Sequence, residues 1–355
     1  MPVDVLRCRV CEAEYPALAT GTCDRCFGPL EPVYDWDVIE LSRERIEAGP
    51  RSLWRYADLL PAPPPPGDES SPGWTPLVSV PRLARAIGVR ELHLKLDSAN
   101  PTHSFKDRVV AVAAAKALEF ALGTLSATST GNLANPVGAR AAALGMPAVI
   151  FCPAGLEPEK LAATTIYGAT IYGIRGSYDD CSRLVSELAG DVEWAIVNVN
   201  LRSYYAEGSK TLAFEICEQL GWETPDAVVM PIGSGAMFTK VWQGFQQFER
   251  LGLSSGGRPK LVGGQAAGCA PVASAFAEER RVMPVRPNSI ASSIAIGNPA
   301  DGDLAIATAV ASSGGIYDVA EEEIGTNISL LAELGGIFGE GATGVALGSL
   351  REEIG

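Results

Sequence analysis

One lysine lies in a sequence context that suits covalent chemistry on a carbonyl group. Lys106 follows the residues 100–105, NPTHSF, and opens an Ala-rich segment with a helical pattern. The helix dipole disfavours a charged amine at a helix N-terminus. The amine avoids that cost when it is neutral, for example in a Schiff base with a carbonyl compound. Lys106 is therefore our candidate catalytic residue, and the alternative is an ordinary solvated lysine.

Two later turns are rich in small and hydroxyl residues, whose backbone N–H groups can approach an anion. The turn TSTGN, residues 128–132, follows a strand-like run and suits a carboxylate, while Asn132 can donate to a cofactor oxygen. The second turn follows the apolar run AVVM and suits a phosphate; its residues are Gly233, Ser234, Gly235, Ala236 and Met237. It lacks the glycine spacing of a dinucleotide fold and the terminal Gly-Lys of a P-loop. Each turn alone also fits an ordinary helix start.

Four cysteines near the N-terminus have the spacing of a metal ribbon. Cys8, Cys11, Cys23 and Cys26 form two Cys-x2-Cys pairs separated by eleven residues. Four thiolates suit a tetrahedral metal ion, zinc or iron, in a closed structural site. Disulfides are the alternative, but they conflict with a cytosolic protein. The other four cysteines are isolated and the chain has only two histidines, which makes a Ser-His-Asp or Cys-His centre improbable.

Composition excludes several classes of partner. The chain has 355 residues and a formal net charge of −14, with 47% hydrophobic and 20% charged residues. This is the composition of a globular protein, and its acidity argues against nucleic acid or anionic lipid as a main partner. No apolar run reaches the roughly 18 residues of a membrane span. The N-terminus has no basic leader followed by an apolar core, so we expect a cytoplasmic protein.

Short β-branched runs alternate with longer helical patterns from about residue 90 onward, which indicates an α/β fold. The predicted strands are 91–96, 125–129, 148–152, 170–174, 195–200, 227–232, 261–265 and 316–319. The predicted helices are 106–122, 133–144, 157–167, 178–188, 207–220, 238–251 and 341–353. Residues 61–73 are Pro-rich and predict an exposed loop. This alternation is typical of parallel sheets with crossover helices, whose ligands bind at the carboxyl ends of the strands.

In their order, these motifs resemble those of pyridoxal-phosphate (PLP) enzymes of the tryptophan synthase β-subunit fold type. More specifically, the chain resembles the threonine synthases, over nearly its whole length. The resemblance is carried by the cysteine pairs and by the segments 74–77 (WTPL), 101–108 (PTHSFKDR), 129–132 (STGN), 207–211 (EGSKT) and 233–237 (GSGAM). It implies an α/β protein of PLP fold type II. Two doubly wound parallel-sheet domains would hold PLP between them, beside a small N-terminal ribbon with four cysteines.

The resemblance also implies roles toward the cofactor. Lys106 would carry PLP as a Schiff base and shuttle protons, with Phe105 at the edge of the cofactor. Asn132 would bind the pyridoxal 3′ oxygen, and residues 233–237 would bind the cofactor phosphate. Thr343 would face the pyridine nitrogen, where a neutral partner fits elimination and replacement chemistry.

Substrate roles follow in the same way. Ser129 and Thr130 would hold the substrate carboxylate. Many threonine synthases carry an arginine, which binds the substrate phosphate, where this chain has Tyr205; Arg202 would replace it from a shifted position. The implied reaction converts O-phospho-L-homoserine and water to L-threonine and phosphate.

Alternative activities remain open because the chain departs from the family pattern at His103, Leu133 and Tyr205. One alternative is a β-replacement synthase acting on O-phosphoserine, like cysteate or cysteine synthases. Others are a threonine or serine deaminase and a ribbon-bearing protein without catalysis. The intact Lys106 motif and the ribbon favour threonine synthase.

We expect three parts in the chain. Residues 1–45 form the ribbon module, 46–109 with 206–355 form a large PLP-binding domain, and 110–205 form a small substrate-binding domain. The family resemblance implies a homodimer.

Overall fold

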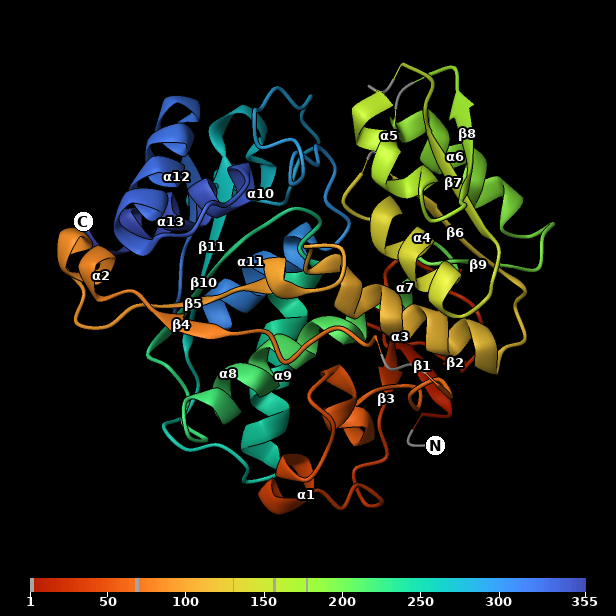
Figure 1. The fold of residues 1–355 in the computed structure, drawn as a ribbon, viewed down its shortest axis with the longest axis horizontal. Coiled ribbons are helices and arrows are strands. Elements are labelled where there is room, and N and C mark those ends of the chain that lie inside the picture. Colours follow the sequence, from red (N-terminus) through yellow and green to blue (C-terminus); the bar gives the residue numbers. More distant parts are fainter. Residues whose placement is uncertain (1–2, 68–69, 130, 156–157, 177) are drawn as a thin grey trace. The chain divides into compact units, whose positions relative to one another are not determined.

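A computed structural model describes residues 3–67, 70–129, 131–155, 158–176 and 178–355. The chain forms two compact units, each built from two stretches of sequence (Figure 1). Unit 1 comprises residues 1–75 and 97–211, and unit 2 comprises residues 76–96 and 212–355. The three-part division expected from the sequence stays a prediction.

Unit 1 begins with a small antiparallel sheet that carries the four N-terminal cysteines. Its strands β1 (Val5–Cys8), β2 (Glu14–Pro16) and β3 (Leu30–Val33) lie in the order β2-β1-β3. Leu6 and Leu30 on these strands are buried in one core with Val110 and Ala113 of helix α3 (Lys106–Glu119). The strands of this sheet have only three or four residues each, and the sheet is stabilised by this core shared with α3.

The main sheet of unit 1 is parallel, in the order β8-β7-β6-β9. Its strands are β6 (Thr124–Thr128), β7 (Ala148–Pro153), β8 (Thr170–Ile174) and β9 (Trp194–Ile196). The connecting helices are α4 (Ala134–Ala143), α5 (Pro158–Thr165) and α6 (Tyr178–Leu188). The nearly continuous apolar run of β7 is buried, as expected for a strand covered on both faces.

Shorter elements complete unit 1. They are α1 (Arg43–Glu47), η1 (Leu53–Leu59), η2 (Asp97–Ala99), α7 (Arg202–Tyr205), η3 (Ala206–Ser209) and the first residues of α8 (Lys210–Gln219). Helix α3 packs against α4, α7 and η3. Its residues 107–117 are buried on all sides, and small alanines allow that close approach.

Unit 2 contains a second parallel sheet and a short antiparallel pair. The sheet has the order β10 (Ala227–Pro231), β11 (Lys260–Ala266), β12 (Ile316–Val319), and β4 (Leu77–Ser79) pairs with β5 (His93–Lys95). Its helices are the rest of α8, α2 (Pro81–Ile87), α9 (Ala236–Arg250), η4 (Ala267–Cys269), α10 (Pro271–Ala277), α11 (Gly302–Ala311), α12 (Glu321–Gly335) and α13 (Gly341–Ile354). Helix α13 packs against all three strands of the parallel sheet.

The α/β class with parallel sheets is confirmed, and the local differences include the following. Strand β5 was expected in a strand–helix alternation, but it pairs antiparallel with β4. Helices α11 and α12 were not predicted. The described residues of the Pro-rich segment, 61–67 and 70–73, form no helix or strand but are not all exposed, because Ala62 is buried and Pro72 O accepts a hydrogen bond from Leu53 N at 2.8 Å. Among the described residues, no helix has the length and apolarity to cross a membrane.

Candidate active site and metal centre

Lys106 is the first residue of α3 and is half-buried in unit 1. Its backbone N–H donates to Ser104 Oγ at 3.2 Å, and its Nζ lies 6.0 Å from the centre of the Phe105 ring. Asp107 accepts two bonds from Thr102, from its N–H at 3.0 Å and its hydroxyl at 2.9 Å. Burial raises the pKa of Asp107, and the Thr102 bonds oppose that rise. The turn before Lys106 is thus held by its own side chains.

His103 shapes the same turn. It adopts φ +59°, an uncommon conformation for a residue with a side chain. Its ring Nδ1 lies 2.9 Å from Ser98 O, and the residue is exposed. These contacts give His103 a local structural role in the turn.

Arg108, two residues after Lys106, is completely buried and was given no role in the sequence analysis. Its guanidinium donates to both carboxylate oxygens of Asp97, at 2.8 Å each. It also donates to Thr75 Oγ1 at 2.9 Å and Thr211 Oγ1 at 3.0 Å. One buried cation therefore connects three other segments of unit 1 to the first turn of α3. The only feature of the sequence that pointed to Arg108 was its position as a charged residue in the motif 101–108.

Three backbone N–H groups converge on Ser129 at the end of β6. Gly131 N, Leu133 N and Ala134 N donate to Ser129 Oγ at 3.1, 3.3 and 3.1 Å. These bonds hold the Ser129 hydroxyl at the start of α4, and the N-terminus of a helix favours a nearby anion such as a carboxylate. Asn132 lies in this turn and is exposed. Thr130 lies outside the described residues.

Asn198 fixes the strand end that precedes this turn and was missed by sequence reasoning. Its Oδ1 accepts from Thr128 N at 3.4 Å, and its Nδ2 donates to Thr128 O at 3.3 Å. No motif in the sequence marks this residue.

Arg202 begins helix α7 in unit 1 and is half-buried. Burial raises the pKa of the neighbouring Tyr205 phenol above its ordinary value, and the charge of Arg202 opposes that rise. The guanidinium therefore acts electrostatically on the Tyr205 hydroxyl. Arg202 and the Ser129 turn belong to the same unit as Lys106.

The turn 233–237 lies in unit 2, between β10 and α9. Gly235 adopts φ +92°, and a Cβ there would lie 2.6 Å from Asp301 O. Asp301 N donates to Ser234 O at 2.9 Å, which closes the turn from the other side. The turn precedes a helix of 15 residues, whose first N–H groups have no partner within the helix. This backbone fits a phosphate group.

Thr343 lies in the first turn of α13, also in unit 2, and is half-buried. A Cβ at Gly339 would lie 2.6 Å from Thr343 Oγ1, so the glycine leaves room for this hydroxyl. Thr343 N donates to Glu340 O at 2.9 Å. The hydroxyl is thus placed at a helix start by the backbone before it.

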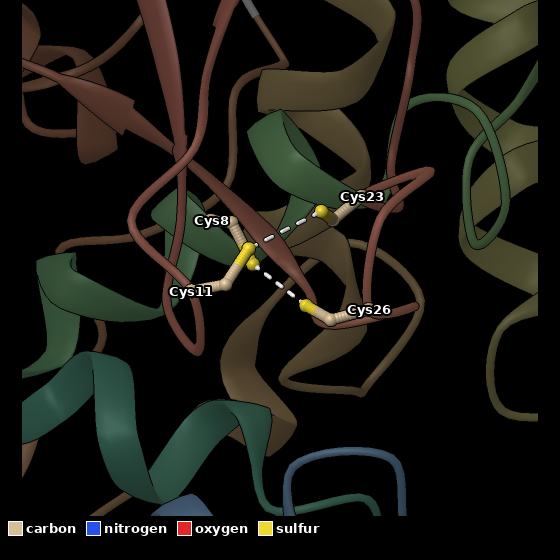
Figure 2. A group of neighbouring side chains, drawn as sticks. All are labelled: Cys8, Cys11, Cys23 and Cys26. Atoms are coloured by element: carbon tan, nitrogen blue, oxygen red, sulfur yellow. Dashed lines mark hydrogen bonds between the residues drawn. The ribbon is translucent and has the colours of Figure 1, made fainter.

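The four N-terminal cysteines form one cluster, with all Sγ atoms within 4.8 Å of one another (Figure 2). The sulfur of Cys8 lies 3.5 Å from that of Cys26, and the sulfur of Cys11 lies 3.6 Å from that of Cys23. A tetrahedral zinc ion with Zn–S bonds of about 2.3 Å separates its sulfur ligands by roughly 3.8 Å. The donor set and its spacing therefore fit such an ion.

The chain matches the family model described as pyridoxal-phosphate dependent enzyme over residues 69–355. It is 35% identical over 353 residues to the threonine synthase of Methanosarcina acetivorans, which covers 98% of this chain and 86% of that protein. It is 36% identical over 342 residues to the threonine synthase of Methanocaldococcus jannaschii, covering 93% and 82%.

Solved structures share the fold. Maize serine racemase superposes with a TM-score of 0.66 at 19% identity, covering 79% of this chain and 84% of that one. Diaminopropionate ammonia lyase from Escherichia coli gives 0.67 at 21% identity, covering 88% and 82%. Family model, relatives and fold agree, and the chain belongs to the pyridoxal-phosphate-dependent enzymes, in the threonine synthase family.

Proposed function

We propose that this enzyme converts O-phospho-L-homoserine and water to L-threonine and phosphate. The observation that carries the proposal is the extent of the match to threonine synthase, which at 35% identity covers 98% of the chain. That match extends over the N-terminal segment with strands β1 to β3 and the four clustered cysteines, which we call the cysteine module. The racemase and deaminase structures cover 78–79% of the chain at 19–20% identity and support the fold alone.

The residues present fit PLP. The turn 233–237, closed on the backbone of Asp301, would bind the cofactor phosphate through N–H groups. Asn132 would donate to the 3′ oxygen, Phe105 would lie at the cofactor edge, and Thr343 would offer a neutral hydroxyl to the pyridine nitrogen. When bound, PLP supplies the electron sink for bond cleavage next to the amino-acid carbon.

Substrate recognition would use residues of unit 1. Ser129 and Thr130 would hold the substrate carboxylate, and the bonds from Gly131 N and Ala134 N fix the Ser129 hydroxyl at the helix start. The guanidinium of Arg202 would bind the phosphate, since its planar fork matches two phosphate oxygens.

Lys106 Nζ would move the protons. The net reaction breaks the bond between the γ-carbon and the phosphate oxygen and releases phosphate. The β-carbon loses one proton and bonds to the hydroxyl of water, while the γ-carbon gains one proton and becomes the methyl group of threonine. The remaining proton of water is taken up by the released phosphate. Because the amine stands at the start of α3, the helix dipole favours its neutral form, which can accept a proton.

We also propose that the Cys8, Cys11, Cys23 and Cys26 cluster binds a structural zinc ion. Four protein ligands leave no open position, so the ion would take no part in the reaction. Thiolate ligands need a reducing compartment, which supports a cytoplasmic location. The homodimer rests on the family resemblance, and light scattering of the purified protein measures its mass.

The test is to incubate the purified, PLP-loaded protein with O-phospho-L-homoserine and to quantify phosphate and amino acids together. Equal amounts of phosphate and threonine are expected. Phosphate with 2-oxobutyrate would replace the proposal with a simple elimination. Release of no phosphate by a PLP-loaded protein would overturn the substrate assignment, and O-phosphoserine with sulfite or sulfide would be assayed next.

A further inference from the structure

The cysteine module is hydrogen-bonded directly to the helix that begins with Arg202. Ser203 Oγ donates to Thr20 O at 3.0 Å, and Tyr204 OH donates to Leu18 O at 2.9 Å. The donors are buried, Ser203 at 2% and Tyr204 at 0% exposed, while the acceptors belong to half-buried Thr20 and exposed Leu18. The two residues that follow Arg202 are therefore both held by one loop of the module.

The same loop fits closely against the backbone that leads into α7. A Cβ at Gly21 would lie 2.1 Å from Val199 O and 3.2 Å from the Cβ of Arg202. No side chain fits at position 21 without displacing this backbone. Loop and helix are thus in direct contact at Arg202 itself.

A third contact holds the other end of the segment. Tyr34 OH, just after β3, donates to Glu207 Oε2 at 2.7 Å, and Lys210 Nζ lies 2.6 Å from the same oxygen. Lys210 Nζ also lies 4.1 Å from the centre of the Tyr34 ring and donates to Leu59 O at 2.8 Å. Burial, and then the Glu207 charge, raise the pKa of Tyr34 well above its ordinary value, so it remains a donor. Residues 202–210 are therefore fixed at both ends.

The contacting loop leads directly into the turn that carries Cys23 and Cys26. Gly21 O accepts from Leu30 N at 3.3 Å, and Thr22 forms a β-bridge with Pro29, so the loop is continuous with the Cys23–Cys26 turn. That turn is closed by Cys23 N donating to Gly28 O at 2.9 Å. Figure 2 shows Cys23 and Cys26 facing the other cysteine pair across the cluster. The cluster and the Arg202 segment thus share one short piece of backbone.

We propose that the cysteine module is a positioning element for phosphate recognition: through Thr20 and Gly21 it holds Arg202 in place for the substrate phosphate. This inference rests on the proposed function, in which Arg202 binds that phosphate. Ser203 and Tyr204 are positioning residues, because they touch the module and act through Arg202. Loosening the contact weakens binding of a phosphate group and leaves proton transfer at Lys106 unchanged.

The test uses the PLP-loaded enzyme with S203A, Y204F and the double variant. Each single change removes one partly buried hydrogen bond to the module and leaves every cysteine in place. The matched controls are S186A, which removes an Oγ bond to Ser182 O, and Y317F, which removes a phenol bond to Glu353. R202A provides the reference for full loss of the guanidinium.

Four quantities are measured: KM and kcat for O-phospho-L-homoserine, the calorimetric affinity for inorganic phosphate, the cofactor absorbance and the zinc content. We expect the double variant to raise KM and to weaken phosphate binding by about threefold to tenfold, the range set by one or two partly lost hydrogen bonds. Its kcat, cofactor absorbance and zinc content should stay within twofold of wild type, and the controls should match wild type throughout.

An unchanged KM and phosphate affinity would overturn the inference, and so would a fall in kcat alone. If the double variant does not fold, S203A alone decides, since it removes a single oxygen atom. A wild-type enzyme that releases no phosphate from O-phospho-L-homoserine overturns the proposed function instead. The phosphate affinities of R202A and the double variant then still decide whether the module positions an anion site.

Discussion

The guanidinium of Arg108 holds the carboxylate of Asp97 through two hydrogen bonds of 2.8 Å each. The arginine is 0% exposed and lies two residues beyond Lys106. Asp97 begins the segment that leads to Lys106, so this pair connects the two ends of one loop. Planar two-bond pairing also fixes the direction of the guanidinium. The turn that carries the lysine is therefore anchored by a charge that water cannot reach.

Removing Arg108 should destabilise the protein strongly. In R108A the Asp97 carboxylate loses its partner in a largely buried place, and such losses cost about 3–5 kcal/mol. We expect the free energy of unfolding, measured by urea titration, to fall by that amount. R183A is the matched control, because Arg183 pairs with Asp180 on the surface and such pairs contribute roughly 0.3–0.5 kcal/mol. Equal falls in the free energy of unfolding for the two variants would show that the buried Arg108 pair stabilises the protein no more than a surface pair.

Replacing Lys106 should remove turnover without unfolding the chain. K106A removes the amine at the start of α3, and loss of a positioned proton-transfer group typically costs a hundredfold or more in rate. We expect phosphate release to fall by at least about that factor, with the urea midpoint close to that of wild type. K260A, at an exposed lysine, should keep full activity. Appreciable turnover by K106A would refute the catalytic assignment.

The parallel sheets were predictable because their strands are apolar enough to stand out from the sequence. Strands 170–174 and 316–319 and helix 178–188 have the predicted bounds, since turn residues flank each of them. The antiparallel β4–β5 pair was not predictable, because β5 pairs with β4, which has only three residues. No periodicity can be read from so short a segment.

Helices α11 and α12 were missed for a different reason. Helix α11 is apolar along most of its length. Helix α12 begins with three glutamates but, like α11, has no side-chain hydrogen bond at its N-cap, so the start of each is only partly marked. These two helices are stabilised by tertiary packing, which local sequence signals do not reveal.

The candidate site was predicted at the level of turns and not of contacts. The sequence marks the Lys106, Ser129 and Gly233 turns, because small residues after an apolar run have a recognisable pattern. It does not reveal that Arg108 meets Thr211, 103 residues away, or that Asn198 holds the end of β6. Such contacts depend on the fold, and the sequence alone does not distinguish a buried charged residue from a solvated one.

Gly235 should tolerate no side chain. An added Cβ would lie 2.6 Å from Asp301 O at a φ of +92°, so G235A must shift the turn. Strain of this kind costs about 1–3 kcal/mol. We expect lower stability of the PLP-free protein and at least about tenfold weaker PLP binding, followed by absorbance titration.

G325A is the control for that change. Gly325 lies inside α12 with no atom within 4 Å of an added Cβ. Alanine there should stabilise the chain by about 0.5–1 kcal/mol and leave PLP binding unchanged. Normal PLP binding by G235A would show that this turn does not hold the cofactor.

Cys217 should make stability sensitive to alkaline pH. Burial raises the pKa of its thiol to about 12, whereas an unfolded cysteine titrates near about 8.5. Below the pKa of the unfolded chain, the thiol is protonated in both the folded and the unfolded state, and its burial contributes fully to the free energy of unfolding. Between the two values only the unfolded chain ionises, so stability falls as pH rises. C217A should show a smaller fall than wild type in urea titrations across this window; identical slopes would exclude the effect.

Zinc removal should expose the four clustered thiols and no others. Cys11 and Cys26 are exposed. Cys8 and Cys23 are buried but lie on the same two turns, which we expect to loosen without the ion. The isolated cysteines are buried in the folded units, and burial raises the pKa of Cys152, Cys181 and Cys269 as well as that of Cys217. A buried, protonated thiol reacts slowly, and a metal-bound thiolate is protected.

Rapid alkylation at pH 8 should therefore rise from near zero to four thiols per chain when a zinc chelator is added. Denaturant should then release the remaining four, which provides the internal count for all eight cysteines. Re-addition of zinc before alkylation should restore protection. Four fast thiols without any chelator, in protein purified under reducing conditions, would mean that the cluster does not bind metal, since the exposed sulfur atoms of Cys11 and Cys26 have no other shield.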